Sequence, residues 1–244
     1  MANDIIRIGI PIANGTNMYP MVKSKSTEIL PLKTIKDDGV EFWNVSFTTL
    51  DCTYIETTRH ISSDGPLPMD VFRGRKFFDI YRGYVVHLQI DKRKEISLSD
   101  IEHCLNMMKK GDALIVNANS YTDKWLSKSG NAIKESDYNT GSPYFSPECM
   151  RGIIDAGTAI LAGNFPSFSN PNTEAGFGID MIAEFFKTPS NMILAPLIDL
   201  ERIEETEVVL QINPINIEGC CGTICSPVIY QGDLKTQFLK YLKS

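Results

Sequence analysis

Short apolar segments alternate with amphipathic ones along the chain, and this order predicts an α/β fold in which residues 1–244 form a single domain. Continuous apolar runs bounded by turn residues are typical of buried strands. The segments with this pattern are 83–91, 111–120, 158–167, 191–200, 206–217 and 228–231. No internal repeat, low-complexity tract or Pro/Gly-rich linker divides the sequence, which also favours one domain.

Helix signals separate these strands. Residues 99–112 place apolar side chains at helical spacing, with Ser99 and Glu102 in the positions of a capping box and Gly111 as the stop. A second helix is expected over 146–157, where a serine cap precedes a proline in the first turn. Two further helices are expected over 179–187 and 234–244.

The stretch "LDCTYIETTRH", which begins at Leu50, carries the first candidate site. In a strand, successive side chains alternate between two faces. One face then carries Leu50, Cys52, Tyr54 and Glu56, and His60 follows in the next turn. A thiol, a phenol, a carboxylate and an imidazole that converge on one place can bind a metal, transfer protons or hold a polar ligand.

Charge and composition narrow the classes of partner. The 24 basic and 30 acidic residues give a net charge of −6 without any Lys/Arg cluster, which argues against nucleic acid and anionic membranes as partners. No apolar run reaches the roughly 18 residues of a spanning helix, and the N-terminal segment lacks the basic start of a signal peptide. Six cysteines without a CxxC pair are typical of free thiols, so a cytoplasmic protein is expected.

Five segments, in their order and spacing, resemble the cyclase family, whose best-known members are bacterial kynurenine formamidases. The segments are "PIANGTNMYP", "GYVVHLQID", "KKGDALIVNANSYTDKW", "YFSPECMRGIIDAGTAILAGNFPSFS" and "NMILAPLIDLERI". The resemblance implies an α/β fold of the swivelling β/β/α type, in which flanking helices surround a β-rich, barrel-like core. It also implies a homo-oligomer, either a dimer or a tetramer.

The family's metal-binding motif, H-x-G-T-H-x-D-x-P-x-H, falls on the stretch quoted above. Thr53 and His60 are identical to the motif, and Glu56 stands in place of its aspartate. In the family, the first two histidines and the aspartate bind a divalent metal, usually zinc. Here the two histidine positions hold Leu50 and Tyr54.

Two further metal ligands of the family, a histidine and a glutamate, fall near Ala183 and on Ala195. Zinc sites need three or four nitrogen, sulfur or oxygen donors, and leucine and alanine offer none. We therefore expect no metal and no cofactor. A new metal site made from the remaining donors of the stretch is the alternative.

The first functional hypothesis is a metal-independent enzyme on the cyclase fold. His60 would act as general acid or base, Glu56 would orient it, and Tyr54 would donate a hydrogen bond to a developing oxyanion. Cys52 would be a nucleophile if it lies within reach of His60. The resemblance implies a small substrate, namely an amide, a lactone or a cyclisable acyl or carbonyl compound.

Two alternatives stay open. One is a ligand-binding or scaffold protein that kept the fold and lost catalysis. The other is a metal-dependent hydrolase of the arylformamidase type. The sequence has three histidines, and neither His87 nor His103 joins a ligand cluster readily, which argues against this second alternative.

Other residues are candidates for contacts with the substrate. Asn164 and Ser167 follow a predicted strand, where the family carries G-T-D-x-P-S. Cys220 and Cys221 belong to the predicted loop "GCCGTICSP". For both segments the alternative is a structural role in a turn. Trp43 is expected to pack in the core or in a lid.

Overall fold

A nine-stranded sheet forms the centre of the protein in a computed structural model that describes residues 4–19, 25–73, 79–90, 94–129, 136–172 and 179–243. Across the sheet the strands follow the order β1-β13-β11-β5-β7-β9-β10-β4-β12. Their bounds are Ile5–Arg7 for β1, Tyr54–Thr57 for β4, Ile80–Leu88 for β5, Ala113–Ala118 for β7, Ile160–Gly163 for β9, Met192–Ala195 for β10, Glu207–Gln211 for β11, Gly222–Ile224 for β12 and Val228–Tyr230 for β13.

Four parallel strands, β5, β7, β9 and β10, make the middle of the sheet, and antiparallel strands flank them. Continuous apolar runs predicted these strands, because a parallel strand in an α/β fold is covered on both faces. The strand predicted over 191–200 is longer than β10. In β10 the pairing ends before Pro196, which has no N–H to donate to a neighbouring strand.

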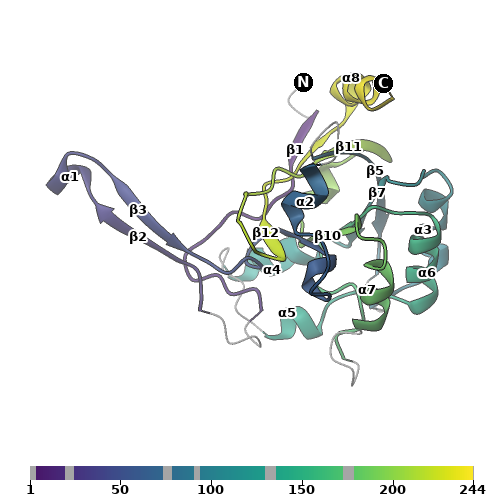
Figure 1. The fold of residues 1–244 in the computed structure, drawn as a ribbon, viewed down its shortest axis with the longest axis horizontal. Helices are drawn as coiled ribbons and strands as arrows, with labels where there is room; N and C mark the ends of the chain where they lie inside the picture. The colour runs from purple at the N-terminus through teal and green to yellow at the C-terminus, as the bar shows by residue number, and fades with distance from the viewer. Residues whose placement is uncertain are drawn as a thin grey trace.

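Helices cover one face of the sheet (Figure 1). They are α3 (Leu98–Leu105), α6 (Pro147–Asp155) and α7 (Ile179–Phe185), and their apolar side chains share a buried cluster with the central strands. Helix α6 begins as predicted, since the Ser146 side chain accepts a hydrogen bond from the Cys149 N–H.

Helix α3 is shorter than predicted and has a different cap. The N–H and the hydroxyl of Ser97 both donate to Asp100, at 2.8 and 2.6 Å. The predicted box of Ser99 and Glu102 is therefore wrong by two residues. The helix ends well before Gly111, and turns connect it to β7.

The opposite face of the sheet curls onto itself. Ile6 of β1 and Ile55 of β4 lie near opposite edges of the sheet, yet both belong to one buried cluster with Val85 of β5. A twisted sheet with tilted strands curls toward a barrel when residues near its two edges pack into one core. The predicted α/β fold with a barrel-like core and flanking helices is confirmed.

Smaller elements complete the molecule. A hairpin of β2 and β3 projects from the body with α1 at its tip, and α8 lies near β11 (Figure 1). The bounds are Glu28–Lys33 for β2, Ile35–Asp38 for α1, Phe42–Ser46 for β3, Pro68–Arg73 for α2, Glu95–Ile96 for β6, Tyr121–Ser129 for α4, Ser136–Thr140 for α5, Tyr144–Phe145 for β8 and Gly232–Lys243 for α8. Among the helices of the described segments, none has the length and apolar character that a bilayer crossing needs.

Three expectations about local structure are wrong. The strand expected from Leu50 begins only at Tyr54, because the preceding residues form a turn in which Cys52 has a φ of 60°. The expected loop of glycines and cysteines contains β12, which pairs with β4. Trp43 is 51 % exposed on the projecting hairpin and packs neither in the core nor in a lid.

Candidate active site

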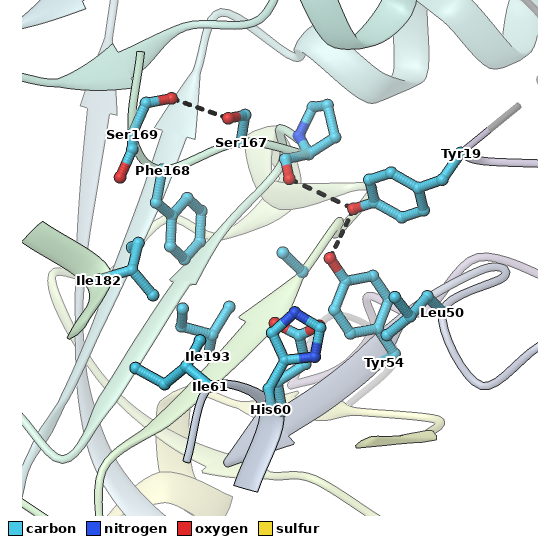
Figure 2. Close-up of a pocket in the computed structure, with 13 residues that line it drawn as sticks. Tyr19, Leu50, Tyr54, His60, Ile61, Ser167, Phe168, Ser169, Ile182 and Ile193 are labelled. Atoms are coloured by element: carbon cyan, nitrogen blue, oxygen red, sulfur yellow. Dashed lines mark hydrogen bonds and ion pairs between the residues drawn. The ribbon is translucent and has the colours of Figure 1, made fainter. Parts of the chain in front are cut away.

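A cavity of about 540 Å³ opens where β4, β10 and α7 meet. Tyr19, Tyr54 and His60 lie at one end of this cavity, and Phe168 and Ile182 lie at the other (Figure 2). The cavity therefore has a polar end and an apolar end. Its volume and its mainly apolar lining are typical of a site for a small molecule.

Strand β4 directs two side chains into this cavity. Tyr54 and Glu56 line it, while Ile55 between them points into the barrel core. Their antiparallel partners on β10, Ala195 and Ile193, line the same cavity. The expectation that Tyr54 and Glu56 share one face is confirmed.

A single 3-10 turn after β4 brings His60 back over Glu56. His60 Nδ1 lies 3.4 Å from Glu56 Oε1. Glu56 is only 7 % exposed, and this burial raises the pKa of its carboxyl, an effect that His60 partly offsets. A carboxylate beside an imidazole is the arrangement that fixes the tautomer of a catalytic histidine.

Cys221 places its thiol beside the same imidazole. Its Sγ lies 3.7 Å from His60 Nδ1, because the pairing of β12 with β4 brings the Cys221 backbone next to Thr57. The hydrogen bond with Cys221 raises the pKa of His60 above its ordinary value of 6.5, burial lowers this pKa, and Glu56 raises it. His60 therefore lies between a thiol and a carboxylate.

Cys52 lies elsewhere. Its Sγ donates a hydrogen bond to the Pro11 carbonyl oxygen at 3.5 Å, within a buried cluster that includes Ile10 and Met18. Burial, with a smaller contribution from Asp51, raises the pKa of the Cys52 thiol to about 12. The structure does not bring Cys52 to His60, and the cysteine within reach of that imidazole is Cys221.

Tyr19 joins the polar end of the cavity, which the sequence did not indicate. Its hydroxyl lies 2.5 Å from the Tyr54 hydroxyl and 3.2 Å from the Pro166 carbonyl oxygen (Figure 2). Burial raises the pKa of both phenols, so both hydroxyls keep their protons near neutral pH. Tyr19 has one hydroxyl proton. It either donates this proton to the Pro166 carbonyl oxygen and accepts from Tyr54, or donates it to Tyr54, which leaves the Tyr54 proton for a ligand.

Three other candidate residues take different places. Asn164 is fully buried, where its amide N–H donates to Asn117 Oδ1 at 2.7 Å and its Oδ1 accepts from the Ala118 N–H at 2.8 Å. It therefore links strands behind the cavity and does not line it. Ser167 lines the cavity, but its hydroxyl donates to the Ser169 carbonyl oxygen. Cys220 is half-buried and lies outside the lining.

The donors at the cavity do not fit the binuclear metal site that the resemblance implies. Leu50 and Ala195 occupy two of the ligand positions and offer only hydrocarbon to the cavity. At a third position the Tyr54 hydroxyl is held by Tyr19. Of the family's ligand positions in this cavity, Glu56 keeps a donor, which is fewer than the three that a zinc site needs. His60 and Cys221 lie beside Glu56, but within the described part of the chain these three residues do not form a group whose ligand atoms all lie within 4.8 Å of one another.

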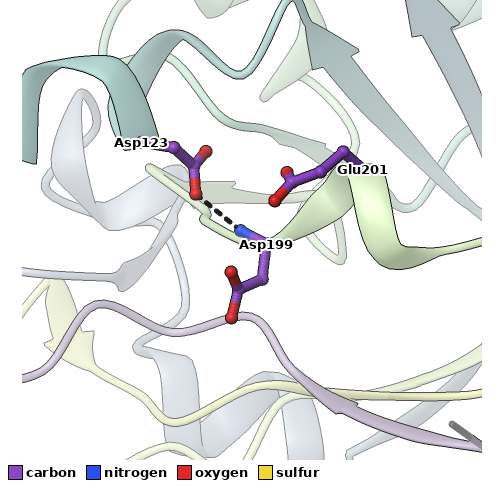
Figure 3. A group of neighbouring side chains, drawn as sticks. All are labelled: Asp123, Asp199 and Glu201. Carbon is purple, nitrogen blue, oxygen red and sulfur yellow. Dashed lines mark hydrogen bonds between the residues drawn. The ribbon is translucent and has the colours of Figure 1, made fainter. Parts of the chain in front are cut away.

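A separate group of carboxylates lies outside this cavity (Figure 3). Oxygens of Asp123, Asp199 and Glu201 lie within 4.8 Å of one another, a spacing that suits a hard cation. The group also has protein partners, since the Asp199 N–H donates to Asp123 Oδ1 at 2.8 Å and Arg202 pairs with Asp199 at 3.3 Å. Burial is the main cause that raises the pKa of Asp123. The sequence did not single out these residues.

Solved structures of several proteins are similar to this chain in fold. No family model matches the chain, and no curated protein matches it. Isatin hydrolase A from Ralstonia solanacearum has a TM-score of 0.74 at 10 % identity, over 92 % of this chain and 90 % of that one. An isatin hydrolase bound to the product analogue thioisatinate has a TM-score of 0.71 at 11 % identity, over 94 % and 93 % of the two chains.

The third structure is a potential metal-dependent hydrolase with cyclase activity. Its TM-score is 0.65 at 12 % identity, over 94 % of this chain and 98 % of that one. At such low identity these likenesses concern the fold, and they show that this chain has the cyclase-family fold. Leu50, Tyr54 and Ala195, at the positions of the family's metal ligands, are therefore differences in side chains on a shared fold.

Proposed function

We propose that this protein is a hydrolase or cyclase that acts on the carbonyl C–N or C–O bond of a small amide, lactone or cyclisable acyl compound without a metal at the cavity. The observation that carries the proposal is the Glu56–His60 pair, which stands at the polar end of an otherwise apolar cavity. Similar structures are hydrolases and cyclases, which supports the class of reaction.

His60 supplies the proton transfers in this proposal. Its Nδ1 faces Glu56 and Cys221, so a neutral imidazole with its proton on Nδ1 leaves the lone pair of Nε2 for a water molecule. Nε2 takes a proton from this water, and the resulting hydroxide attacks the carbonyl carbon. The imidazolium then returns the proton to the departing nitrogen or oxygen.

Tyr54 stabilises the charge that develops on the carbonyl oxygen. Its hydroxyl lies at the polar end of the cavity, next to the Tyr19 hydroxyl (Figure 2). A neutral phenol is a good hydrogen-bond donor to an oxyanion in a poorly hydrated site. The raised pKa of Tyr54 keeps that proton in place at the pH at which His60 is neutral.

The apolar end of the cavity indicates the rest of the substrate. Phe168, Ile182 and Ile193 form a wall that would exclude a charged group and would accept an aromatic ring or a branched chain. An aryl amide, an aryl ester or a fused lactam such as isatin has this shape, with a carbonyl at one end. The reacting carbonyl would then lie beside His60.

The test is a hydrolysis assay on aryl formamides, aryl lactones and isatin, with protein stripped of metal by a chelator and checked by elemental analysis. Activity should survive the chelator and should fall by at least about 100-fold in His60→Gln, since general acid–base catalysis contributes that much or more. His103→Gln is the matched control, because His103 lies on α3 away from the cavity.

Loss of activity on stripping, with recovery on adding zinc, would contradict the metal-independent mechanism. Binding of these compounds without turnover, in the wild type and in His60→Gln alike, would favour the ligand-binding protein instead. That alternative has its own support in the apolar residues at the family's metal positions, Leu50 and Ala195.

A further inference from the structure

Two half-buried cysteines, Cys220 and Cys221, differ from the other four cysteines of the chain. The other four are buried, and burial raises the pKa of each of their thiols: Cys52, Cys104, Cys149 and Cys225. A cysteine reacts through its thiolate, so thiols in such places are unreactive. Any reactive cysteine of this chain is therefore Cys220 or Cys221.

The imidazole of His60 distinguishes these two neighbours. Cys221 Sγ lies 3.7 Å from His60 Nδ1, which is within the reach of a hydrogen bond to sulfur. A base at this distance activates a thiol by taking its proton. Glu56 Oε1 lies 3.4 Å from the same Nδ1, and a carboxylate there favours the imidazolium that the transfer creates. The nucleophile, its base and a carboxylate thus lie next to one another.

Strand pairing holds the thiol in this place. Cys221 directly precedes β12, and its carbonyl oxygen accepts hydrogen bonds from the N–H and the hydroxyl of Thr57, both at 3.3 Å. The next residue, Gly222, is the partner of Glu56 across the two strands. A Cβ at Gly222 would lie 3.4 Å from Glu56 Cγ, so glycine leaves room for the carboxylate beside His60.

A second contact between a cysteine and a histidine shows that access matters as well. Cys104 Sγ lies 3.3 Å from His103 Nε2, but Cys104 is fully buried. By contrast, the side chain of His60 is 38 % exposed and Cys221 is half-buried. Among the six cysteines, all of which lie in the described ranges, Cys221 therefore combines a neighbouring base with access from solvent.

We propose that Cys221 is a modification site, a thiol that small hydroperoxides oxidise reversibly to a sulfenic acid. The thiol proton passes to His60 Nδ1, and the thiolate sulfur attacks one oxygen of the peroxide. The S–O bond forms, the O–O bond breaks, and the departing hydroxide or alkoxide takes the proton back from His60. Sulfur is oxidised by two electrons, and the peroxide is reduced to water or an alcohol.

The sulfenic acid has no ready partner within the chain. Consecutive Cα atoms are about 3.8 Å apart, which is shorter than the roughly 4.4–6.8 Å that a disulfide spans, so a bond to Cys220 is disfavoured. The other thiols are buried. We therefore expect the oxidised form to last until a thiol from solution reduces it.

Oxidation would also stop the proposed hydrolysis, a consequence that rests on the proposed function. Hydrolysis uses the tautomer of His60 with its proton on Nδ1 and a lone pair on Nε2. A sulfenic O–H at Cys221 that donates to Nδ1 favours the other tautomer, with the proton on Nε2. His60 then has no lone pair with which to take a proton from water.

Limited labelling of the full native chain with iodoacetamide tests the activation of the thiol. Cys220→Ser and Cys221→Ser each leave one half-buried thiol, so mass spectrometry of the peptide gives the rate of each. Cys221 should react at least about tenfold faster than Cys220, and His60→Gln should remove most of this difference. His103→Gln is the matched control, since its neighbour Cys104 is buried, and should leave the rate of Cys221 unchanged.

Equal rates at the two cysteines, or a Cys221 that stays fast in a folded His60→Gln, would overturn the proposal. The comparison of Cys220→Ser with Cys221→Ser keeps this test valid even if His60→Gln does not fold, which circular dichroism checks.

Dilute hydrogen peroxide then tests the oxidation itself. After this treatment Cys221 should form an adduct with dimedone, a reagent for sulfenic acids, and dithiothreitol added before dimedone should prevent the adduct. A Cys221 that iodoacetamide labels but peroxide leaves unchanged would overturn the proposal. These measurements need no turnover, so an inactive chain would leave them standing, and an unreactive thiol would leave the hydrolysis assay standing.

Discussion

At the scale of single residues, Glu56 and His60 are two ionisable groups whose pKa values the fold raises for different reasons. Burial dominates at Glu56, and the hydrogen bond with Cys221 dominates at His60. The two effects have different consequences. The burial of Glu56 mainly changes the stability of the folded protein. The hydrogen bond between Cys221 and His60 changes the pH range in which the imidazole is neutral.

Replacing Cys221 should shift the pH dependence of activity. His60 must be neutral to accept a proton, so the rate falls as the pH drops below the His60 pKa. Cys221→Ala removes the largest cause that raises this pKa, so the acid limb of the kcat/KM profile should move to lower pH. Cys220→Ala, at the adjacent half-buried thiol, should leave the limb in place. An unchanged limb in Cys221→Ala would show that the thiol does not act through His60.

Glu56→Gln should stabilise the fold while it lowers activity. The fold raises the pKa of Glu56 above its ordinary value of 4.5. The protonated carboxyl therefore contributes to the stability of the folded protein below pH 4.5, and this contribution is lost as the pH rises through the raised pKa. Above that range the buried carboxylate is unfavourable, and an amide removes the penalty. We expect a Tm gain of about 2–4 °C near pH 8, which corresponds to about 1 kcal/mol in a chain of this size, and almost none near about pH 4.

The matched comparison for this prediction is Glu102→Gln on the exposed side of α3. It should change neither Tm nor its pH dependence. A lower Tm for Glu56→Gln at alkaline pH would mean that the contact with His60 outweighs the burial of the carboxylate.

At the scale of elements, the short strand β4 organises the site. It lies between β10 and β12, so its two neighbours supply Ala195 and Ile193 on one side and the chain at Cys221 on the other. The turn before β4 is fixed by Asp51, whose carboxylate accepts hydrogen bonds from Thr27 and Thr48 at the base of the hairpin of β2 and β3. The position of Tyr54 and Glu56 thus depends on hydrogen bonds made outside the cavity.

Removing these hydrogen bonds should destabilise the protein. Asp51→Ala leaves the Thr27 hydroxyl and the Thr48 N–H without their acceptor in a buried place. We expect a loss of about 2–4 kcal/mol in the free energy of unfolding, measured by urea titration. Asp64→Ala, on an exposed loop, should change this quantity by less than about 0.5 kcal/mol. A comparable loss in both variants would rule out a special role for the buried carboxylate.

At the scale of the whole molecule, the curled sheet creates the cavity by giving its two faces different environments. One face closes into the barrel core around Ile55, and the other carries Tyr54 and Glu56 toward α7. The hairpin of β2 and β3 projects from the body and adds no side chain to the described cavity lining (Figure 1).

Local patterns in the sequence were enough to indicate the α/β class and part of the site, while the barrel-like core was implied by the resemblance to the cyclase family. Apolar runs located the central strands, since burial on both faces leaves that mark in the sequence. Strand alternation placed Tyr54 and Glu56 on one face, and the short spacing to His60 brought the imidazole near. These features depend on residues that are close together along the chain.

The tertiary structure alone decided which groups meet across long separations. Strand alternation placed Cys52 on the face of Tyr54 and Glu56, but Cys52 lies in a turn with a left-handed backbone, and the thiol beside His60 is that of Cys221, from a distant part of the chain. Tyr19 reached Tyr54 in the same way. Periodicity predicts the face on which a side chain lies, whereas the pairing of strands decides which side chain lies opposite.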